Sequence, residues 1–286
     1  MKIRFWGTRG SIPSPGPSTI RYGGNTSCVE VTLDDGTLIV LDAGSGIRAL
    51  GKSLGAAHGT LLLSHYHWDH IQGFPFFDSV YLPGSKWRVL GPEFNGAGPN
   101  EYLSDQMVSP YFPATMSQMS ALTGFEVVPH APFRLGSATI TSTRLSHPSV
   151  TLGYRIEADD SVFVYISDNE VDVAPRDQLT NIMDLASDAD ILVHDCQYTE
   201  PEYAGKRGWG HSTPRQAVRV AREAGVRELV VFHHDPTHND EQVEALAEEA
   251  RRLALRGVDI SIAREGDVID LNSMDEVVAA DIRAEG

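Results

Sequence analysis

Residues 61–70 read LLLSHYHWDH, a short apolar run that passes directly into a cluster of metal-ligand side chains. The Leu-rich run predicts a buried strand. Side chains repeat every two residues along a strand, so His65 and His67 are expected on one side of its end. The turn that follows can bring Asp69 and His70 to a second position nearby. Zinc and similar cations prefer imidazole and carboxylate ligands, so the stretch predicts half of a two-metal site. A surface cluster of histidines is the competing interpretation, and the apolar strand before the motif argues against it.

The same arrangement recurs along the chain, where short β-branched or Leu-rich runs end in His or Asp. Such runs of about four to six residues predict buried strands. Layered α/β proteins place their chemistry just after their strands. A turn residue would explain one such case but not the whole series. The series comprises Asp42 after LIVL, His147 after ATITSTRLS, Asp168 after SVFVYIS, His194 and Asp195 after ILV, and His233 and His234 after LVVF.

The bulk composition is that of a globular chain, with 286 residues, 41% apolar and 22% charged. No apolar run approaches the ~20 residues of a membrane helix, and the N-terminus lacks a signal peptide's apolar core, so a cytoplasmic protein is expected. Cys28 and Cys196 suggest neither a disulfide framework nor a cysteine zinc site, and each is expected to be buried. A net charge of −16 disfavours tRNA or duplex DNA as a partner. A small anion stays compatible, because metal charge dominates inside a cleft.

Helices are expected at residues 177–187, 213–224 and 239–256. Pro214 in the first turn marks the second, and Asn239 followed by acidic residues marks the third. Strands come first and then alternate with helices, which predicts sheets sandwiched between helices.

One domain over residues 1–286 is expected, because no internal repeat, low-complexity segment or interdomain linker appears. Residues 74–130 differ from the rest in being rich in aromatic residues, Pro and Met. We expect a loop-rich insertion beside the site, and a subdomain that only covers the core is the alternative.

The histidine-rich motif resembles the HxHxDH signature of the metallo-β-lactamase superfamily, and LDAGSG at 41–46 resembles that family's first motif. The later His in LSHP, Asp in YISD and His in VFHH follow in the family's order, so the likeness spans roughly residues 1–270. The resemblance implies an α/β fold, an αββα sandwich of two mixed sheets between helical layers. It also implies two divalent metal ions at one edge, zinc foremost, with manganese or iron as alternatives.

The resemblance also assigns roles to individual residues. Asp69 counts among the catalytic residues as well as the ligands. His233 and His234 compete for one ligand position, since adjacent strand residues face opposite sides. We prefer His233, because VFH matches the register of LSH at 63–65. By this likeness His65, His67 and His147 hold one ion, Asp69, His70 and His233 hold the other, Asp168 bridges them, and Asp42, His194 and His234 support the ligands from outside.

Two further segments bear on the reaction: HDCQYT at 194–199 and GHST at 210–213 resemble motifs of ribonuclease Z and related phosphodiesterases. In that group the His of GHST donates a proton to the leaving oxygen and an acidic residue steers it. His211 and Asp195 are the corresponding residues here. The helix that begins after His211 also favours an anion. The alternative is that both side chains only cap a helix or a turn.

The chain departs from ribonuclease Z itself, which carries a long basic arm for tRNA. Only residues 148–167 separate His147 from Asp168, and no basic insertion rich in Gly and Pro appears. We therefore expect a phosphodiesterase acting on a small molecule, such as a cyclic or linear nucleotide, and not on tRNA. Hydrolysis of a thioester or lactone is the second hypothesis, a non-catalytic metal-bound sensor module is the third, and a homodimer is compatible with the sequence.

A substrate pocket is expected around four side chains. Asn25 lies in the loop GGNTS and can reach toward the metals. The aromatic residues Trp68, Phe76 and Tyr111 can stack on a base. The alternatives are a plain tight turn at Asn25 and aromatic side chains that only pack in the core.

Overall fold

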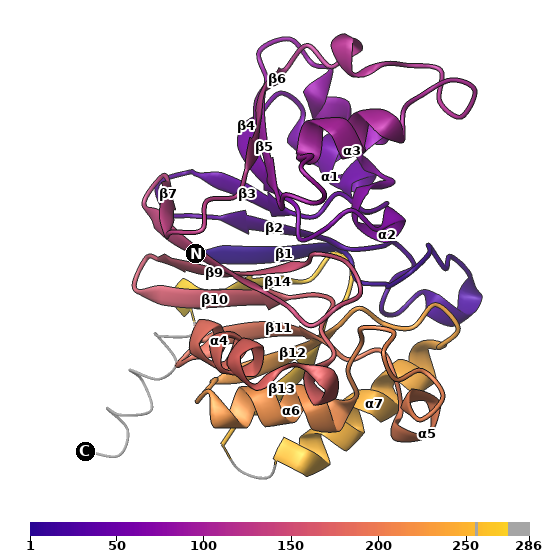
Figure 1. The fold of residues 1–286 in the computed structure, drawn as a ribbon, viewed down its shortest axis with the longest axis vertical. Helices are drawn as coiled ribbons and strands as arrows, with labels where there is room; N and C mark the ends of the chain where they lie inside the picture. The colour runs from indigo at the N-terminus through magenta and orange to yellow at the C-terminus, as the bar shows by residue number, and fades with distance from the viewer. Residues whose placement is uncertain (255–256, 274–286) are drawn as a thin grey trace.

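The structure, a computed structural model, describes residues 1–254 and 257–273. Two seven-stranded sheets pack face to face, and helices cover the outer face of each (Figure 1). Three apolar clusters follow from this layering: one between the sheets, one between the first sheet and its helices, and one between the second sheet and its helices. The αββα sandwich of two mixed sheets is confirmed.

The first sheet is antiparallel on one side and parallel on the other. The pairs from β14 to β3 are antiparallel, and those from β3 to β6 are parallel. In spatial order its strands are β14 (Val268–Asp270), β1 (Lys2–Gly7), β2 (Cys28–Thr32), β3 (Leu38–Leu41), β4 (His58–Leu62), β5 (Lys86–Gly91) and β6 (Leu122–Val127).

The second sheet repeats this division. Its pairs from β7 to β10 are antiparallel, and those from β10 to β13 are parallel. In spatial order its strands are β13 (Asp259–Ile262), β12 (Glu228–Phe232), β11 (Ile191–Asp195), β10 (Ser161–Ile166), β9 (Leu152–Ala158), β8 (Ala138–Arg144) and β7 (Phe133–Leu135).

The helices follow the chain in two groups. The first sheet is covered by α1 (Ile47–Leu54), α2 (Trp68–Ile71) and α3 (Pro99–Asp105), and the second by α4 (Arg176–Ala186), α5 (Glu200–Tyr203), α6 (Pro214–Glu223) and α7 (Asp240–Ala254) (Figure 1). Short 3₁₀ helices lie at Pro17–Thr19, Phe74–Phe76, Asp78–Val80, Met116–Gln118 and Val171–Val173.

The three helices expected from the sequence are confirmed as α4, α6 and α7, each beginning within one residue of its predicted start. The predicted end of the third, at 255–256, lies outside the described residues. Cys28 and Cys196 are buried, free thiols, as expected.

Residues 74–130 differ from the expected insertion, because they contribute β5 and β6 to the first sheet. The period of these strands is masked in the sequence by aromatic and Pro residues on either side. The loop-rich part is therefore confined to the stretches that flank β5 and α3.

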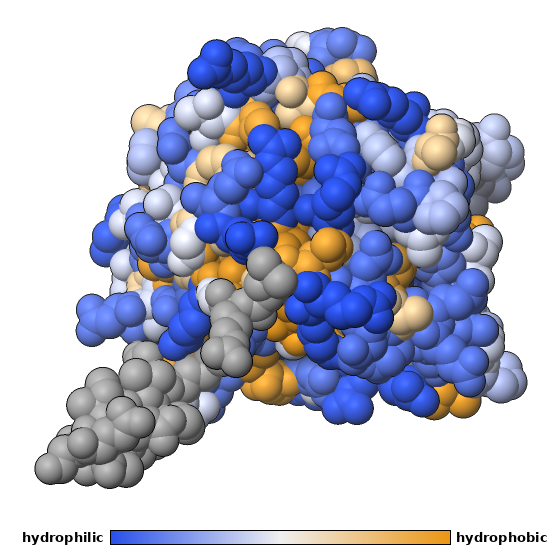
Figure 2. Space-filling view, turned by 90° about the horizontal axis from the view of Figure 1, so that it is seen from below, coloured by the Kyte–Doolittle hydropathy of each residue, from blue (hydrophilic) through white to orange (hydrophobic). Residues whose placement is uncertain are grey.

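The outer surface beneath the second sheet is largely hydrophilic, with apolar residues in separate patches (Figure 2). Among residues 1–254 and 257–273, no helix has both the length and the apolar character needed to cross a membrane.

Candidate metal centre

The ligand-type residues meet at one edge of the sandwich. They follow β4, β8, β10 and β12, so both sheets contribute. Because β3, β4, β10 and β12 belong to the parallel parts of their sheets, their carboxyl ends open toward the same edge. The edge therefore gathers side chains that are as many as 168 positions apart in sequence, from His65 to His233.

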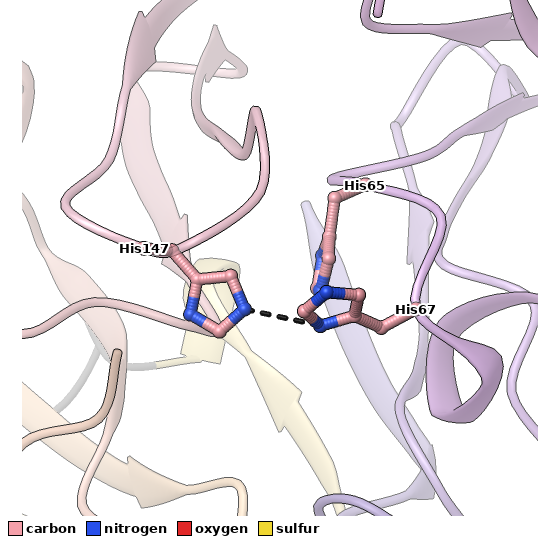
Figure 3. A group of neighbouring side chains, drawn as sticks. All are labelled: His65, His67 and His147. Atoms are coloured by element: carbon pink, nitrogen blue, oxygen red, sulfur yellow. Dashed lines mark hydrogen bonds between the residues drawn. The ribbon is translucent and has the colours of Figure 1, made fainter. Parts of the chain in front are cut away.

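His65, His67 and His147 form one compact group, shown in Figure 3. Their nearest ring nitrogens lie within 4.8 Å of one another. His147 Nε2 lies 3.1 Å from His67 Nδ1, the contact drawn as a dashed line. Three imidazole nitrogens that converge in this way can hold a single cation.

Asp69, His70 and His233 form a second group, also within 4.8 Å. The Oδ2 atom of Asp69 lies 3.3 Å from His70 Nε2 and 3.2 Å from His233 Nε2. Asp168 stands between the two groups, with Oδ1 2.9 Å from His70 Nε2 and 3.9 Å from His65 Nε2. Its other oxygen, Oδ2, lies 3.0 Å from His233 Nε2. The carboxylate is thus placed to face both groups.

In four of the histidines the rear nitrogen, Nδ1, is already engaged by the protein. Such contacts fix the ring orientation and the tautomer, and leave Nε2 for the centre. Nε2 of His65 is buried and has no hydrogen-bond partner in the described part of the chain, and Nε2 of His70 and Oδ1 of Asp168, although 2.9 Å apart, are buried without forming a hydrogen bond there. Buried polar atoms without partners are costly, and a cation between them would satisfy all three. The rear contacts run from His65 to Ser64 Oγ at 3.0 Å, from His70 to Asp42 Oδ2 at 2.8 Å, from His147 to Gly210 O at 3.0 Å and from His233 to Gln197 Oε1 at 2.9 Å.

The protonation states also suit a cation. Burial lowers the pKa of His65 well below its ordinary value and that of His147 to about 4, so both rings are neutral at pH 7. Burial opposes ionisation of Asp168, but His233, His70 and His65 outweigh it and hold its pKa well below the usual range. Burial also opposes the charge on His70, yet Asp168, Asp69 and Asp42 raise its pKa well above the usual range, so in the metal-free site this ring carries the positive charge that a bound cation would replace. Neutral imidazoles and ionised carboxylates are the forms that bind metal.

Positive charge at the centre comes from histidines alone among residues 1–254 and 257–273. Every ion pair of Asp69 and of Asp168 within these residues is with a His, and none is with Lys or Arg. Two buried carboxylates without a permanent cation are expensive unless a metal pairs with them. The donor set therefore fits divalent cations.

His233 faces the centre and His234 does not. The backbone of His233 is left-handed, with φ +58°, so the alternation of the strand ends at Phe232. A side chain at Gly10 would overlap the His233 ring, so only glycine fits there. The ring of His234 instead lies 3.0 Å from the carbonyl of Ala263 through Nε2. His234 therefore supports β13 and not the ligands, unlike the expectation.

Of the other two residues expected to support the ligands, Asp42 contacts a ligand-type residue and His194 does not. Asp42 contacts His70 directly, accepts from Ser64 N at 2.7 Å and accepts from the Tyr165 hydroxyl at 2.8 Å. His194 is buried, and its Nε2 lies 3.3 Å from Asn169 Nδ2. Its Nδ1 lies 2.7 Å from the carbonyl oxygen of Asp195, and within the described part of the chain it makes no hydrogen bond or ion pair with the seven ligand-type residues.

His211 lies beside the centre, paired with Asp195. Its Nδ1 is 2.7 Å from Asp195 Oδ2, and its ring stacks 5.0 Å from the His233 ring and lies 5.3 Å from the His147 ring. Burial alone would lower the pKa of His211, but Asp195, with Asp168 and Asp69, raises it to about 9. His211 also forms a close group with Asp168 and His233. With Nδ1 engaged, Nε2 is the nitrogen left to act toward the centre.

Sequence reasoning missed Glu170, a fully buried carboxylate. It accepts hydrogen bonds from Gly208 N and Gly210 N, both at 2.8 Å, and from the Tyr203 hydroxyl at 2.8 Å. It thereby holds the loop that carries His211 and that contacts His147 through Gly210 O. An acidic residue two positions after Asp168 in SDNE was the available signal, and Gln197 in HDCQ was equally visible.

The four expected pocket residues separate in the structure. Trp68, Phe76 and Tyr111 line one cavity beside α2. Asn25 lines a different hollow, and its side chain is taken up by Glu265 Oε2 at 2.9 Å and by the Ser45 hydroxyl at 3.0 Å. The side-chain amide of Asn25 therefore links neighbouring loops to one another.

The fold and these groups define a metallo-β-lactamase-fold hydrolase. The family model described as "Beta-lactamase superfamily domain" matches residues 37–234, and the chain belongs to this family. The matched range includes every ligand-type residue named above as well as His211.

Individual relatives are similar along nearly the whole chain. The "Probable metallo-hydrolase YhfI" of Bacillus subtilis (strain 168) is 26% identical over 94% of this chain and 99% of its own length. A "Ribonuclease Z" of Haloferax volcanii is 26% identical over 82% of this chain and 84% of its own. A crystal structure of a "New Diphosphatase from the PhnP Family" is 19% identical, with a TM-score of 0.69 over 94% of this chain and 97% of that one. This last likeness shows the shared fold alone.

Proposed function

We propose that this protein is a dinuclear metal-dependent phosphodiesterase acting on a small diester, with a cyclic or linear nucleotide as the leading substrate class. The observation that carries the proposal is the His211–Asp195 pair, held at 2.7 Å beside the centre. A diester leaving group departs as an alkoxide, which a positioned general acid stabilises. The leaving group of a thioester departs as a thiolate, which needs no such proton.

The residues would hold the two cations in the groups described above. His65, His67 and His147 would bind one, Asp69, His70 and His233 the other, and Asp168 would bridge them; zinc is the first choice for this donor set. Two cations there would supply Lewis acidity, polarising the phosphoryl oxygens and making water a nucleophile at neutral pH.

The protein's own side chains manage the protons. Water attacks phosphorus, and the bond from phosphorus to the leaving oxygen breaks. Asp69 accepts the proton that the water loses. His211 donates its Nε2 proton to the leaving oxygen, while Asp195 holds the imidazole in place through Nδ1.

A small substrate agrees with the charge of the chain. A net charge of −16 repels a long polyanion, whereas a single phosphate meets the local charge of the cations. The relatives named ribonuclease Z show that the same family includes enzymes named for RNA, and tRNA precursor therefore belongs in the test.

The experiment is a substrate panel on protein reconstituted with Zn²⁺ or Mn²⁺. It comprises bis-p-nitrophenyl phosphate, cyclic nucleotides, a thioester, a lactone and a tRNA precursor. We expect turnover of the small diesters and none of the tRNA precursor. Efficient thioester or lactone hydrolysis with silent diesters would overturn the proposal.

A further inference from the structure

A cavity of about 710 Å³ opens beside α2 and is walled by aromatic rings. This volume lies within the ~300–1,000 Å³ typical of small-molecule sites. Tyr66 stacks on Tyr102 with ring centroids 4.4 Å apart, and Phe76 meets Phe112 edge to face at 5.5 Å. The tyrosine hydroxyls are bound to backbone carbonyls, Tyr66 to Pro92 O and Tyr102 to Phe94 O. These rings therefore present fixed apolar faces.

The cavity and the metal centre share one short segment of the chain. Tyr66 and Trp68 alternate in sequence with His65, His67 and Asp69, so one short segment supplies ligands to the centre and rings to the cavity. A substrate that binds at both places would therefore span this one segment.

Three of the rings remain open to solvent although they are large and apolar. Trp68 is 78% exposed, Tyr111 83% and Phe76 51%. Aromatic side chains gathered at such exposure beside a catalytic centre contribute little to the core and are available for a ligand.

The charge of the lining selects the chemical class of the occupant. Among the lining residues Asp105 is the one charged side chain, and there is no Lys, Arg or His. A second phosphate or a carboxylate would be repelled here, whereas an uncharged planar ring would stack. The carboxylate of Asp105 makes no hydrogen bond or ion pair within residues 1–254 and 257–273, so it can accept from ring N–H or amino groups.

We infer that this aromatic cavity binds the nucleobase of a mononucleotide diester. The inference rests on the proposed function and adds the side chains that bind the base of the substrate. Stacking on rings tolerates any base, and the absence of cationic lining residues disfavours longer oligonucleotides, which need contacts to further phosphates.

The test compares two esters that share one leaving group and one charge, adenosine 5′-(p-nitrophenyl) phosphate and methyl p-nitrophenyl phosphate. Base stacking is worth about 5- to 150-fold in binding, so the adenosine ester should show a KM lower by that factor. Trp68→Ala and Tyr111→Ala should raise this KM toward the value of the methyl ester, and the increase should be larger for the adenosine ester than for the methyl ester. Trp68→Phe should restore most of the difference, because a ring remains.

Two controls separate binding from damage. Elemental analysis must show the same metal content in the Trp68 variants, since Trp68 sits between His67 and Asp69. Val268→Ala changes another exposed apolar side chain, on β14, and should leave both esters unaffected. Equal KM increases for both esters, a lower KM for a tetranucleotide, or a change in oligomeric state on Trp68→Ala without a change in KM would overturn the inference.

Calorimetric titration of the metal-loaded protein with uncharged adenosine gives a readout that needs no turnover. Adenosine binding that weakens in Trp68→Ala supports the assignment of the cavity as a base-binding site. If the same protein hydrolyses no diester, the proposed function is wrong and the cavity assignment still stands. Adenosine binding that is absent, or that is unchanged in Trp68→Ala, overturns the cavity assignment whatever the enzyme hydrolyses.

Discussion

Replacing His211 by Ala removes the imidazole beside the centre and leaves all seven ligand-type residues in place. For a diester with an alkyl leaving group, loss of a positioned general acid costs about 10²–10⁴-fold in kcat, or roughly 3–5 kcal/mol in the barrier. p-Nitrophenolate leaves without a proton, so only one hydrogen bond to the phosphate is lost. That bond is worth about 1 kcal/mol, or about fivefold.

Asp195→Asn is the matched partner variant. The asparagine keeps an oxygen for Gln197 N, now 3.0 Å from Asp195 Oδ1, but loses the carboxylate that raises the pKa of His211 to about 9. Without that carboxylate, burial opposes the charge on the ring, so the pKa of His211 and its protonated fraction at pH 7 both fall. Activity on alkyl diesters is therefore lost as pH rises through about 9 in the wild type and through a lower pH in Asp195→Asn.

The assay measures kcat for p-nitrophenyl and alkyl diesters across pH, together with metal content by elemental analysis. We expect intact metal content, a large loss on alkyl esters and a small one on p-nitrophenyl esters. Equal losses for both leaving groups would show that His211 only binds phosphate. An unchanged pH profile in Asp195→Asn would refute the link between the two residues.

Three further outcomes follow from particular contacts. His65→Ala removes a buried ligand-type nitrogen, so metal content and activity on every substrate should fall together; elemental analysis that still finds two ions per chain would contradict its assignment. Glu170→Gln replaces one of the two oxygens that accept from Gly208 N and Gly210 N by an NH₂ donor, which should cost about 1–3 kcal/mol of unfolding free energy and lower kcat through the displaced His211 loop. Denaturant unfolding and kinetics check this, and unaltered values would remove Glu170 from any positioning role. Burial lowers the pKa of His234 to about 3, so the unfolded chain takes up a proton below pH 6.5 that the folded chain does not, and stability falls by about 1.4 kcal/mol per pH unit as pH drops from there. The difference in unfolding free energy between wild type and His234→Asn should therefore shrink by about 2 kcal/mol from pH 6.5 to pH 5, and a constant difference would be the contrary result.

The sequence by itself determined the candidate ligands and the class of fold, because both depend on local patterns. His65, His67, Asp69 and His70 are fixed relative to one another within six positions. Apolar runs and helix-start signals are equally local, and α4, α6 and α7 begin where those signals lie. The strands β5 and β6, inside residues 74–130, were not predicted. They are strands because they pair with neighbours in the first sheet, and their own sequences show no clear strand period.

Only the tertiary structure decided which side chains face the centre. Past the end of a strand the direction of a side chain depends on backbone dihedrals and on contacts with distant loops, and neither is written in the local pattern. The left-handed backbone of His233 turns its ring toward the centre, whereas the ring of His234 points away from it and contacts the carbonyl oxygen of Ala263. Glu265 draws Asn25 away from the aromatic cavity, while a buried Glu170 sets the loop of His211. The residue types therefore indicate the chemistry of the site. Its geometry depends on hydrogen bonds between segments far apart in the chain, because these bonds form only after the two sheets have packed.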